Sequence, residues 1–295
     1  MDPIELSDSQ IKTFQRCPRR WAYSKLLKLS ADEDSDNLVF GNALHDSLEQ
    51  YILTGSPEKG AEAAVKYVEE NASQLSSPDV KNWQCIVAPA MFQGMAIHFF
   101  PDFIKEYEPV AVEEWFTSQA DPYVKVRGYK DLKVRKRSTG KICLWDYKSS
   151  GSYGGGDLAK TVNFNNQLSR YAVNERRVFG EWPEEVGLIF AIKPRDEDPQ
   201  AAAQKARTTS KNYFKTTVQV TPAFAQFALH VEQSDVLYGH QMLQMREAFL
   251  QQGPAALNYI PPNFDACFEY GTLCGFAKGC HSGHPAHQTL CRGNT

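Results

Sequence analysis

Two aspartates and a lysine in the middle of the chain have types and spacing that suit chemistry at a phosphate. Asp146 and Lys148 stand two residues apart at the end of an apolar run, and Asp131 lies fifteen residues before Asp146, one expected hairpin away. Two neighbouring carboxylates resist joint ionisation unless a cation neutralises them, so the pair suits a hard divalent ion such as Mg²⁺. Lys148 would share a sheet face with Asp146, where it could orient a water molecule and stabilise charge at a phosphate.

The same D-x-K pattern also occurs at Asp131 and Lys133, for which Asp121 would be the upstream partner. We prefer Asp146 because its strand is apolar and is therefore expected inside a sheet, whereas Asp131 lies in a basic strand that we expect to be more exposed. Surface salt bridges are the alternative role for all of these side chains.

Two helical patterns frame the acidic pair in the sequence. An amphipathic run (GNALHDSLEQYI) places Gly41 and His45 four residues apart. A second expected helix carries Gln167 and Tyr171, also four apart and therefore on one helix face, where they could reach a phosphate or the lysine. A lone histidine on such a helix is more often a buried structural residue than a ligand, and this is the alternative for His45.

The seven cysteines divide into a group of four and three others. The group has one member near the N-terminus and three near the C-terminus: Cys17, Cys267, Cys274 and Cys280. Four thiolates are enough for a tetrahedral Zn²⁺ ion or a [4Fe–4S] cluster, and their spacing does not decide between the two. Weaker alternative zinc ligands are His281, His284 and His287. Ordinary buried thiols are expected at Cys85, Cys143 and Cys291, and are the remaining alternative for the group of four.

The elements that must position these residues change character along the chain. The first third has helical periodicity, with a capping box at Ser7 and Gln10 and a helix end at Pro18. Runs of β-branched and aromatic residues follow and predict antiparallel hairpins. Helices are expected at 41–52, 58–74, 79–107, 162–179 and 222–251. Strands are expected at 110–117, 123–127, 129–136, 141–147, 185–193 and 212–220.

Composition narrows the class of protein. The 295 residues are 42% hydrophobic, enough for a substantial core, and the net charge is −3. That charge is uneven, at −9 over 1–120, +8 over 121–215 and −2 over 216–295. A basic middle is usually a solvated face, but it could also bind a polyanion. The chain has no run of about 18 apolar residues and no signal peptide, so we expect no membrane span and a cytoplasmic protein.

The ordered motifs GNALH, GYKD, DYK and QLSRY resemble the RecB-like branch of the PD-(D/E)XK nuclease superfamily. This resemblance implies an α/β fold, with a mixed central sheet flanked by helices, in a single nuclease domain over 1–295. The parts of that domain would be a mainly helical part over 1–108, a core over 109–220, a long helix over 221–260 and a cysteine-bearing clasp over 261–295.

The resemblance also implies roles for individual residues. The metal site, filled by Mg²⁺ or Mn²⁺, would consist of His45, Asp131 and Asp146. The catalytic group would be Asp131, Asp146, Lys148, Gln167 and Tyr171, in which the lysine positions the attacking water. The four-cysteine pattern is similar to that of iron–sulfur nucleases in this branch, which include the AddB nuclease domain, CRISPR-associated RecB-like exonucleases and phage-encoded relatives. It implies a [4Fe–4S] cluster, with Zn²⁺ as the alternative. Its spacing departs from the C-x2-C pattern of the first two groups and fits the phage type better.

The function that the resemblance implies is metal-dependent exonuclease cleavage of DNA, on single strands or at ends. The DNA backbone would be held by basic side chains of the middle third: Arg127, Lys130, Lys133 and Arg135. The rival is a DNA-binding or complex subunit with the same fold, no cleavage and a zinc ion at its cysteines. A third interpretation is a zinc-ribbon scaffold around an unrelated enzyme. Protein partners could belong to recombination, replication or CRISPR adaptation.

Overall fold

The computed structural model describes residues 2–29, 35–150, 162–260, 262–269, 272–274, 276 and 280. Cys291 and the weaker zinc candidates His281, His284 and His287 lie outside these residues. The contacts within the chain define two compact units. Unit 1 comprises Met1–Glu33, Thr117–Gly128 and His230–Thr295, and unit 2 comprises Asp34–Phe116 and Tyr129–Leu229. Each unit therefore combines segments that are distant in the sequence, and the expected boundaries at 108, 220 and 260 do not coincide with this division.

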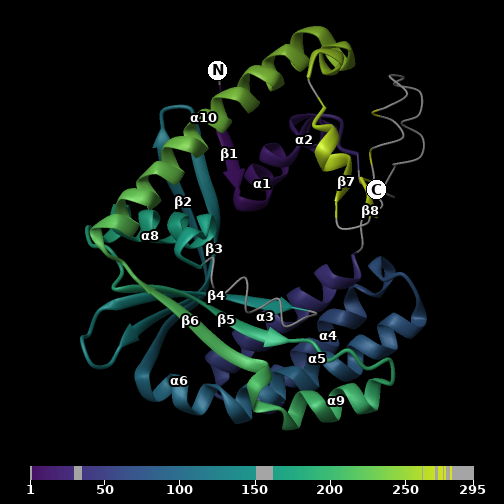
Figure 1. Cartoon of the computed structure of the whole chain (residues 1–295), viewed down its shortest axis with the longest axis vertical. Coiled ribbons are helices and arrows are strands. Elements are labelled where there is room, and N and C mark those ends of the chain that lie inside the picture. Colours follow the sequence, from purple (N-terminus) through teal and green to yellow (C-terminus); the bar gives the residue numbers. More distant parts are fainter. Residues whose placement is uncertain are drawn as a thin grey trace. The chain divides into compact units, whose positions relative to one another are not determined.

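Strand β4 (Ile142–Ser150) lies inside the sheet of unit 2 (Figure 1). It is antiparallel to β3 (Val124–Lys136) and parallel to β5 (Glu185–Ile192). On the far side of β5 runs the antiparallel β6 (Tyr213–Gln219), and β2 (Tyr107–Asp121) pairs with β3. All eight residues of β5 are buried, as expected for a strand covered on both faces. The prediction that the apolar β4 run lies inside the sheet is confirmed.

The core of unit 2 is built around Trp145 on β4, which is fully buried. Its indole meets the rings of Phe103 and Tyr107 edge-on, at 5.4 and 5.3 Å between ring centroids. Gly187 on β5 lies beside the indole, and a Cβ atom at this position would collide with that ring and stand 2.7 Å from the Thr216 carbonyl oxygen. Glycine at position 187 therefore sets how closely β5 approaches the indole.

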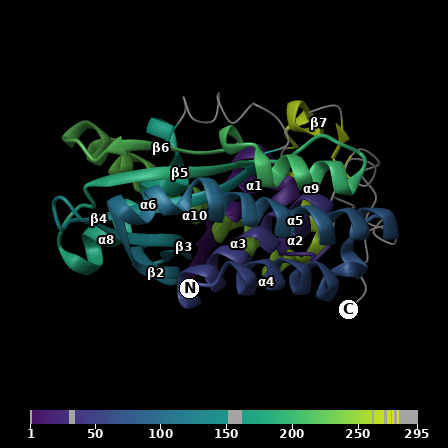
Figure 2. The same cartoon turned by 90° about the horizontal axis from the view of Figure 1, so that it is seen from below.

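Helices cover both faces of this sheet (Figure 1). One face carries α3 (Asp36–Thr54), α4 (Pro57–Glu70), α5 (Pro78–His98), α6 (Phe100–Glu106) and α9 (Pro199–Thr208). Of these, α5 and α9 lie side by side (Figure 2). The other face carries α8 (Asn166–Phe179), which contacts β4 and β5. Short 3₁₀ turns connect these elements: η1 (Ala72–Gln74), η2 (Val162–Phe164) and η3 (Ser210–Asn212).

Local signals explain where several of these helices begin and end. Ser56 and Ser77 each stand before a proline and accept a hydrogen bond of 3.2 Å from the backbone N–H three residues later. Asp198 caps α9 in a similar way. Gly55 and Gly180 end α3 and α8 in the left-handed conformation that favours glycine. Although α9 carries a capping signal, it is absent from the predicted elements.

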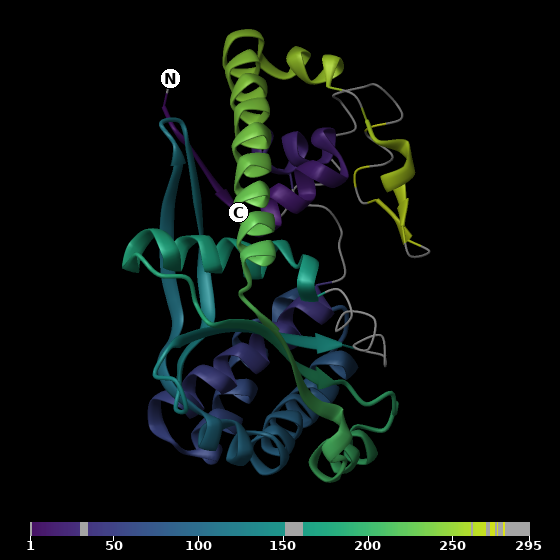
Figure 3. The ribbon, with the colours of Figure 1, turned by 60° about the vertical axis from the view of Figure 1, so that its left-hand side comes forward.

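Unit 1 begins with β1 (Ile4–Ser7), which pairs in parallel with the first residues of β3. Ser7 accepts a hydrogen bond of 3.3 Å from the Gln10 backbone N–H, and a second helix begins at Pro18, so the predicted cap and helix end are confirmed. The helices of this unit are α1 (Asp8–Arg16), α2 (Pro18–Lys25) and the later part of α10 (Pro222–Gln252), drawn in purple and green in Figure 3. Its remaining elements are η4 (Gly253–Tyr259), η5 (Phe264–Cys267), β7 (Phe268–Glu269) and β8 (Thr272–Leu273).

The predicted fold class is confirmed, because the structure is α/β with a mixed sheet flanked by helices. Two boundaries differ from the prediction. The helix expected at 79–107 is divided into α5 and α6, and the strands expected at 123–127 and 129–136 form one continuous strand, β3. Strand β1 is not among the predicted elements. Within the described ranges, no helix is long and apolar enough to cross a membrane.

Candidate metal centre

The pairing of β3 with β4 brings Asp131 and Asp146 together. Leu132 lies opposite Trp145 in the antiparallel register, so Asp131, one residue before Leu132, and Asp146, one residue after Trp145, occupy neighbouring positions on the two strands. Asp131 is 4% exposed and Asp146 is 0% exposed, and the Tyr171 hydroxyl lies 3.4 Å from one carboxylate oxygen of each. The expectation that Asp131 is exposed is therefore wrong, because Tyr171 of α8 and His45 of α3 lie against it.

His45 on α3 and Glu113 on β2 form a group with Asp131. His45 Nδ1 lies 3.2 Å from Glu113 Oε1 and 3.6 Å from Asp131 Oδ2. One ligand atom from each of these residues lies within 4.8 Å of the others, and this is the one such group of metal-ligating side chains in the described part of the chain. Asp131 Oδ2 also accepts a hydrogen bond of 2.8 Å from the Tyr147 backbone N–H. The group contains two of the three expected ligands, His45 and Asp131, together with Glu113, and the third expected ligand, Asp146, lies beside Asp131.

Glu113 is the site residue that sequence reasoning missed. Its φ is +48°, a left-handed conformation that residues other than glycine rarely adopt. Around this backbone irregularity, the adjacent side chains reach different partners, since Glu113 meets His45 and Glu114 meets Lys130. The available signal is a pair of glutamates in the middle of an otherwise apolar strand (VAVEEWFT). A strained residue that carries a carboxylate into a buried site is a mark of function rather than of packing.

Lys148, Gln167 and Tyr171 form a chain of polar contacts beside the aspartates. Lys148 Nζ pairs with Asp146 Oδ2 at 2.5 Å and donates a hydrogen bond of 3.2 Å to Gln167 Oε1. Gln167 Nε2 donates a hydrogen bond of 2.8 Å to the Tyr171 hydroxyl. The structure therefore brings the residues of the DYK and QLSRY motifs into direct contact.

The charges at this site favour a bound cation. Burial lowers the pKa of His45, but its hydrogen bond with Glu113 and the charges of the aspartates outweigh burial and raise that pKa to about 9. Burial and the Asp146 carboxylate raise the pKa of Asp131, although His45 and Lys148 act in the opposite direction. Three carboxylates thus surround a histidine that holds a proton, and a metal ion bound by the His45 ring would displace that proton. Imidazole and carboxylate oxygens are ligands that Mn²⁺ and Mg²⁺ accept, so the residues present fit such an ion.

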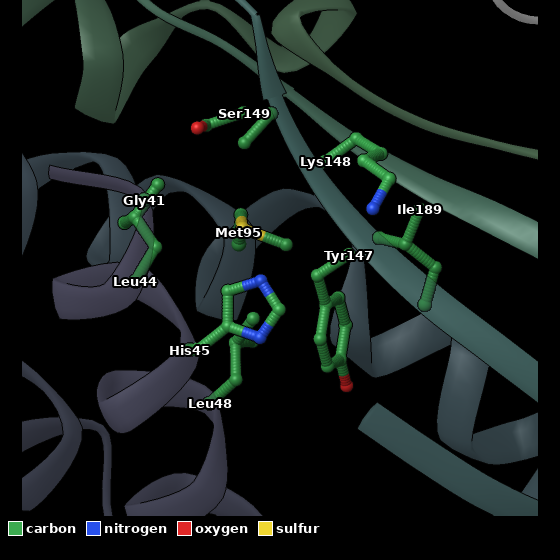
Figure 4. A pocket seen from close by; sticks show the side chains of 10 residues that line it. Gly41, Leu44, His45, Leu48, Met95, Tyr147, Lys148, Ser149 and Ile189 are labelled. Carbon is green, nitrogen blue, oxygen red and sulfur yellow. The ribbon is translucent and has the colours of Figure 1, made fainter. Parts of the chain in front are cut away.

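A narrow pocket beside His45 is too small to receive a nucleotide (Figure 4). Its walls are mainly apolar, and the His45 ring meets the Tyr147 ring edge-on, with 5.9 Å between centroids. The cavity volume is about 10 Å³, at most the space of one water molecule. Gly41 lines the same pocket, where a Cβ atom would stand 3.6 Å from Ser149 Oγ, so space alone does not require the glycine of the GNALH motif. The side chains that line this pocket, Tyr147 among them, pack against the histidine ring.

Lys130 and Lys133 are buried, which corrects their expected role in DNA binding. Lys130 Nζ lies 2.9 Å from Glu114 Oε2 and 2.8 Å from Glu175 Oε2. Lys133 Nζ lies 2.6 Å from Glu175 Oε1. Ammonium groups that are enclosed and neutralised in this way cannot hold a phosphate backbone. The same pairing removes the support for the competing D-x-K pattern, because its lysine faces Glu175 rather than Asp131.

Arg127 and Arg135, the other two expected DNA contacts, are not buried. Arg135 is exposed on β3 and donates a hydrogen bond of 2.9 Å to a backbone carbonyl five residues later. Arg127 belongs to unit 1, where it lies 3.6 Å from Glu5. Asp121, the upstream partner of the competing pattern, is also in unit 1 and meets His240 at 2.5 Å.

The four cysteines of the expected cluster lie in unit 1 and interact with one another and with neighbouring N–H groups. The pKa of Cys267 is raised by its burial and by the charges of the other three, Cys280, Cys274 and Cys17. The Asn263 backbone N–H donates to Cys17 Sγ at 3.5 Å, and the Arg19 guanidinium donates to Cys280 Sγ at 3.6 Å. All six cysteines among the described residues are free thiols.

The sulfurs of these cysteines do not form a ready-made group of three around one point in the described part of the chain. Tetrahedral Zn–S bonds of about 2.3 Å place the sulfurs about 3.8 Å apart. Within the described ranges, no three cysteine sulfurs come within 4.8 Å of one another. In a [4Fe–4S] cluster each thiolate binds a different iron, so its ligands stand farther apart than those of a single ion. Four thiols with N–H donors at two of the sulfurs fit such a cluster.

Comparison with known proteins gives one family match. The model of the PD-(D/E)XK nuclease superfamily matches residues 5–281 of this chain. None of the curated proteins matches. Among solved structures, 18 chains match, and one of them is described as the crystal structure of LHK-Exo in complex with dAMP. That chain is 13% identical in sequence, the alignment covers 75% of this chain and 99% of the other, and the TM-score is 0.31.

Proposed function

Because the chain belongs to the PD-(D/E)XK nuclease superfamily, we propose that it is a metal-dependent nuclease that hydrolyses phosphodiester bonds in DNA. The observation that carries this proposal is the group of His45, Glu113 and Asp131, whose ligand atoms lie within 4.8 Å of one another. A lysine paired with the buried Asp146 stands beside this group. Packing alone does not call for so many buried carboxylates in one place, because their burial is costly without a cation.

His45, Glu113 and Asp131 would hold Mg²⁺ or Mn²⁺. The ion would supply Lewis-acid polarisation of the scissile phosphate and a lower pKa for the attacking water. Asp146 adds a buried negative charge beside Asp131, and this charge favours a bound cation. The Tyr171 hydroxyl, placed between the two aspartates, keeps their carboxylates oriented.

Lys148 is the member of the site that meets the substrate from the solvent side. Its side chain is 34% exposed, whereas that of its partner Asp146 is 1% exposed. An ammonium group in this position stabilises the charge that develops on the phosphate and orients the attacking water. Gln167 accepts a hydrogen bond from Lys148 and donates one to Tyr171, so the lysine is held in one position for this task.

We infer that DNA is held by its backbone and that the enzyme is an exonuclease acting on single strands or ends. The order of the GNALH, GYKD, DYK and QLSRY motifs, typical of the RecB-like branch, supports this inference. Exposed basic side chains such as Arg135 suit contacts with phosphates, which carry no sequence information. The affinity for DNA should therefore be independent of the DNA sequence and should fall as the salt concentration rises.

We further propose that Cys17, Cys267, Cys274 and Cys280 bind a [4Fe–4S] cluster. The charge effect of the other three thiols on the pKa of Cys267 and the N–H donors at Cys17 and Cys280 support this proposal. The ligand bonds would join residues 250 positions apart in the chain, from Cys17 to Cys267, and would stabilise unit 1. Zinc is the alternative occupant, and metal analysis together with the visible spectrum separates the two.

A time course on labelled linear, circular, single-stranded and double-stranded DNA tests the proposed activity. We expect cleavage with Mg²⁺ or Mn²⁺, none with a chelator, and loss of cleavage but not of DNA binding in Asp146→Ala and Lys148→Ala. Asp102→Ala is the matched control, since Asp102 also pairs with a nearby lysine, Lys105 three residues later, but lies on the surface, 85% exposed. Cleavage at the wild-type rate by Asp146→Ala refutes the assignment. DNA binding without cleavage by the wild type identifies the rival, a non-cleaving subunit.

A further inference from the structure

Four charged side chains form a buried cluster next to the proposed metal ligands. Lys130 Nζ lies 2.9 Å from Glu114 Oε2 and 2.8 Å from Glu175 Oε2. Lys133 Nζ lies 2.6 Å from Glu175 Oε1 and 3.9 Å from Glu114 Oε1. The side chains of both lysines and of Glu175 are at most 6% exposed, and that of Glu114 is 30% exposed. We call these four residues the lysine–glutamate cluster.

Each element that contributes to the lysine–glutamate cluster also contributes a residue to the proposed active site. On β2 and β3 the two kinds of residue are adjacent in sequence, and on α8 they are one helical turn apart. These neighbours are Glu113 with Glu114, Asp131 with Lys130, and Tyr171 with Glu175. The ion pairs that join β2, β3 and α8 therefore also set the distances between the site residues on those elements.

Two phenylalanine rings lie against the lysine–glutamate cluster, the buried Phe116 and the exposed Phe179. Lys133 Nζ lies 3.8 Å from the centroid of the Phe179 ring, and Lys130 Nζ lies 5.8 Å from the centroid of the Phe116 ring. Phe116 also meets Tyr171 edge-on, with 5.9 Å between centroids. Because both lysines and Glu175 are shielded from water, the local dielectric is low and the attraction between the paired charges is strong. The cluster thus resists displacement of any one of its members.

Stability alone is a poor reason for a buried cluster of this kind. Taking charged groups out of water has a large desolvation cost, and well-packed apolar side chains of similar volume often give equal or greater stability. Ion pairs differ from apolar contacts in permitting only a narrow range of positions. We propose that the lysine–glutamate cluster positions Glu113, Asp131 and Tyr171, and that its loss weakens binding of the divalent cation. This proposal rests on the proposed function, which identifies those residues as the active site.

Binding of Mn²⁺ to the purified full chain tests the proposal without any need for cleavage. The electron paramagnetic resonance signal of free Mn²⁺ falls as the ion binds and gives its dissociation constant. We expect Lys130→Met to raise that constant about tenfold, the low end of the range for residues that support metal ligands. Glu114→Gln should raise it less, about threefold, because Glu114 is partly screened by solvent. Lys130→Arg, which keeps the charge, should retain most of the affinity.

Glu184→Gln is the matched control. Glu184 pairs at 3.2 Å with Lys136, another lysine of β3, and both side chains are 17% exposed. Neither residue is adjacent to a proposed metal ligand. We expect Glu184→Gln to bind Mn²⁺ as the wild type does. If the lysine–glutamate cluster only stabilised the fold, Glu114→Gln and Glu184→Gln would both lower the melting temperature, and neither would change the Mn²⁺ dissociation constant.

The outcomes separate the positioning role from the proposed function. Wild-type Mn²⁺ affinity in both Glu114→Gln and Lys130→Met overturns the positioning role. If Lys130→Met does not fold, Glu114→Gln alone decides. If the wild type cuts no DNA but binds Mn²⁺, and the cluster variants bind it more weakly, the proposed function is refuted and the positioning role is supported. Absence of Mn²⁺ binding to the wild type overturns both.

Discussion

The Tyr171 hydroxyl offers a sharp test of how the site is organised, because one oxygen serves three groups. It accepts a hydrogen bond from Gln167 and lies 3.4 Å from a carboxylate oxygen of both Asp131 and Asp146. Tyr171→Phe removes this oxygen but keeps the ring, which packs edge-on against Phe116. We therefore expect the variant to fold and to lose only the polar contacts.

The expected loss of activity follows from these contacts. A hydrogen bond to a charged group contributes about 1.5–3 kcal/mol. The two contacts to carboxylates are long, so we assign about 1.5–2 kcal/mol to the hydroxyl as a whole. Because about 1.36 kcal/mol corresponds to a tenfold change in rate, kcat/KM should fall about 10- to 30-fold.

The assay compares steady-state cleavage of labelled DNA by the wild type, Tyr171→Phe and a control, Tyr213→Phe. Tyr213 on β6 also has a buried hydroxyl, which donates a hydrogen bond of 2.6 Å to the Ala206 carbonyl. Tyr171→Phe should lose up to about 2 kcal/mol of unfolding free energy and Tyr213→Phe about 1 kcal/mol, with a fall in Tm of about 2–4 °C per kcal/mol. Only Tyr171→Phe should lose activity. Equal activity of Tyr171→Phe and the wild type would refute the reasoning, and so would an equal loss in Tyr213→Phe.

Three further changes test the fold and the cysteine site. Gly187→Val should lower the unfolding free energy by about 2–4 kcal/mol, measured in urea, because its side chain would meet the Trp145 ring and a backbone carbonyl. Burial raises the pKa of Glu185, but its hydrogen bonds outweigh burial and lower that pKa. The ionised Glu185 therefore stabilises the wild type above the unfolded pKa of about 4.3, and this stability is lost as the pH falls through the lower folded pKa. In Glu185→Gln, the free energy of unfolding measured in urea should fall less steeply over this acid range. Cys274→Ser should lower Tm and remove the visible absorption of the cluster, whereas the control Cys85→Ser should change neither. An unchanged spectrum and Tm in Cys274→Ser would contradict the proposed cluster.

The parts of the molecule that could be predicted from the sequence depend on residues close together in the chain. The cap at Ser7 and the helix end at Pro18 involve only neighbouring positions. The meeting of Asp131 with Asp146 requires one hairpin, which the strand and turn pattern predicts. Local alternation and helical periodicity thus account for much of the fold and for the order of the candidate site.

The parts that could not be predicted depend on partners far away in the chain. A basic run normally lies in solvent, and nothing near Lys130 in the sequence indicates that Glu175, 45 residues later, neutralises it. Glu113 enters the site only because α3 lies beside β2 and because the backbone turns locally into the left-handed region. Strand β1 is short, and its partner in β3 lies more than one hundred residues away, as the pairing of Ile4 with Val124 shows.

The division of the chain into two units has a consequence for the order of events during synthesis. Unit 2 ends at Leu229, so every side chain of the candidate metal centre has been made before that point. Cys280, the last of the four cysteines, follows 51 residues later, which is roughly 3–10 s at ribosomal speeds of about 5–20 residues per second. Cys17 is therefore made long before the other three cysteines, Cys267, Cys274 and Cys280. A cluster or zinc ion at the cysteines would therefore be inserted last, after every residue of the candidate metal centre has been made.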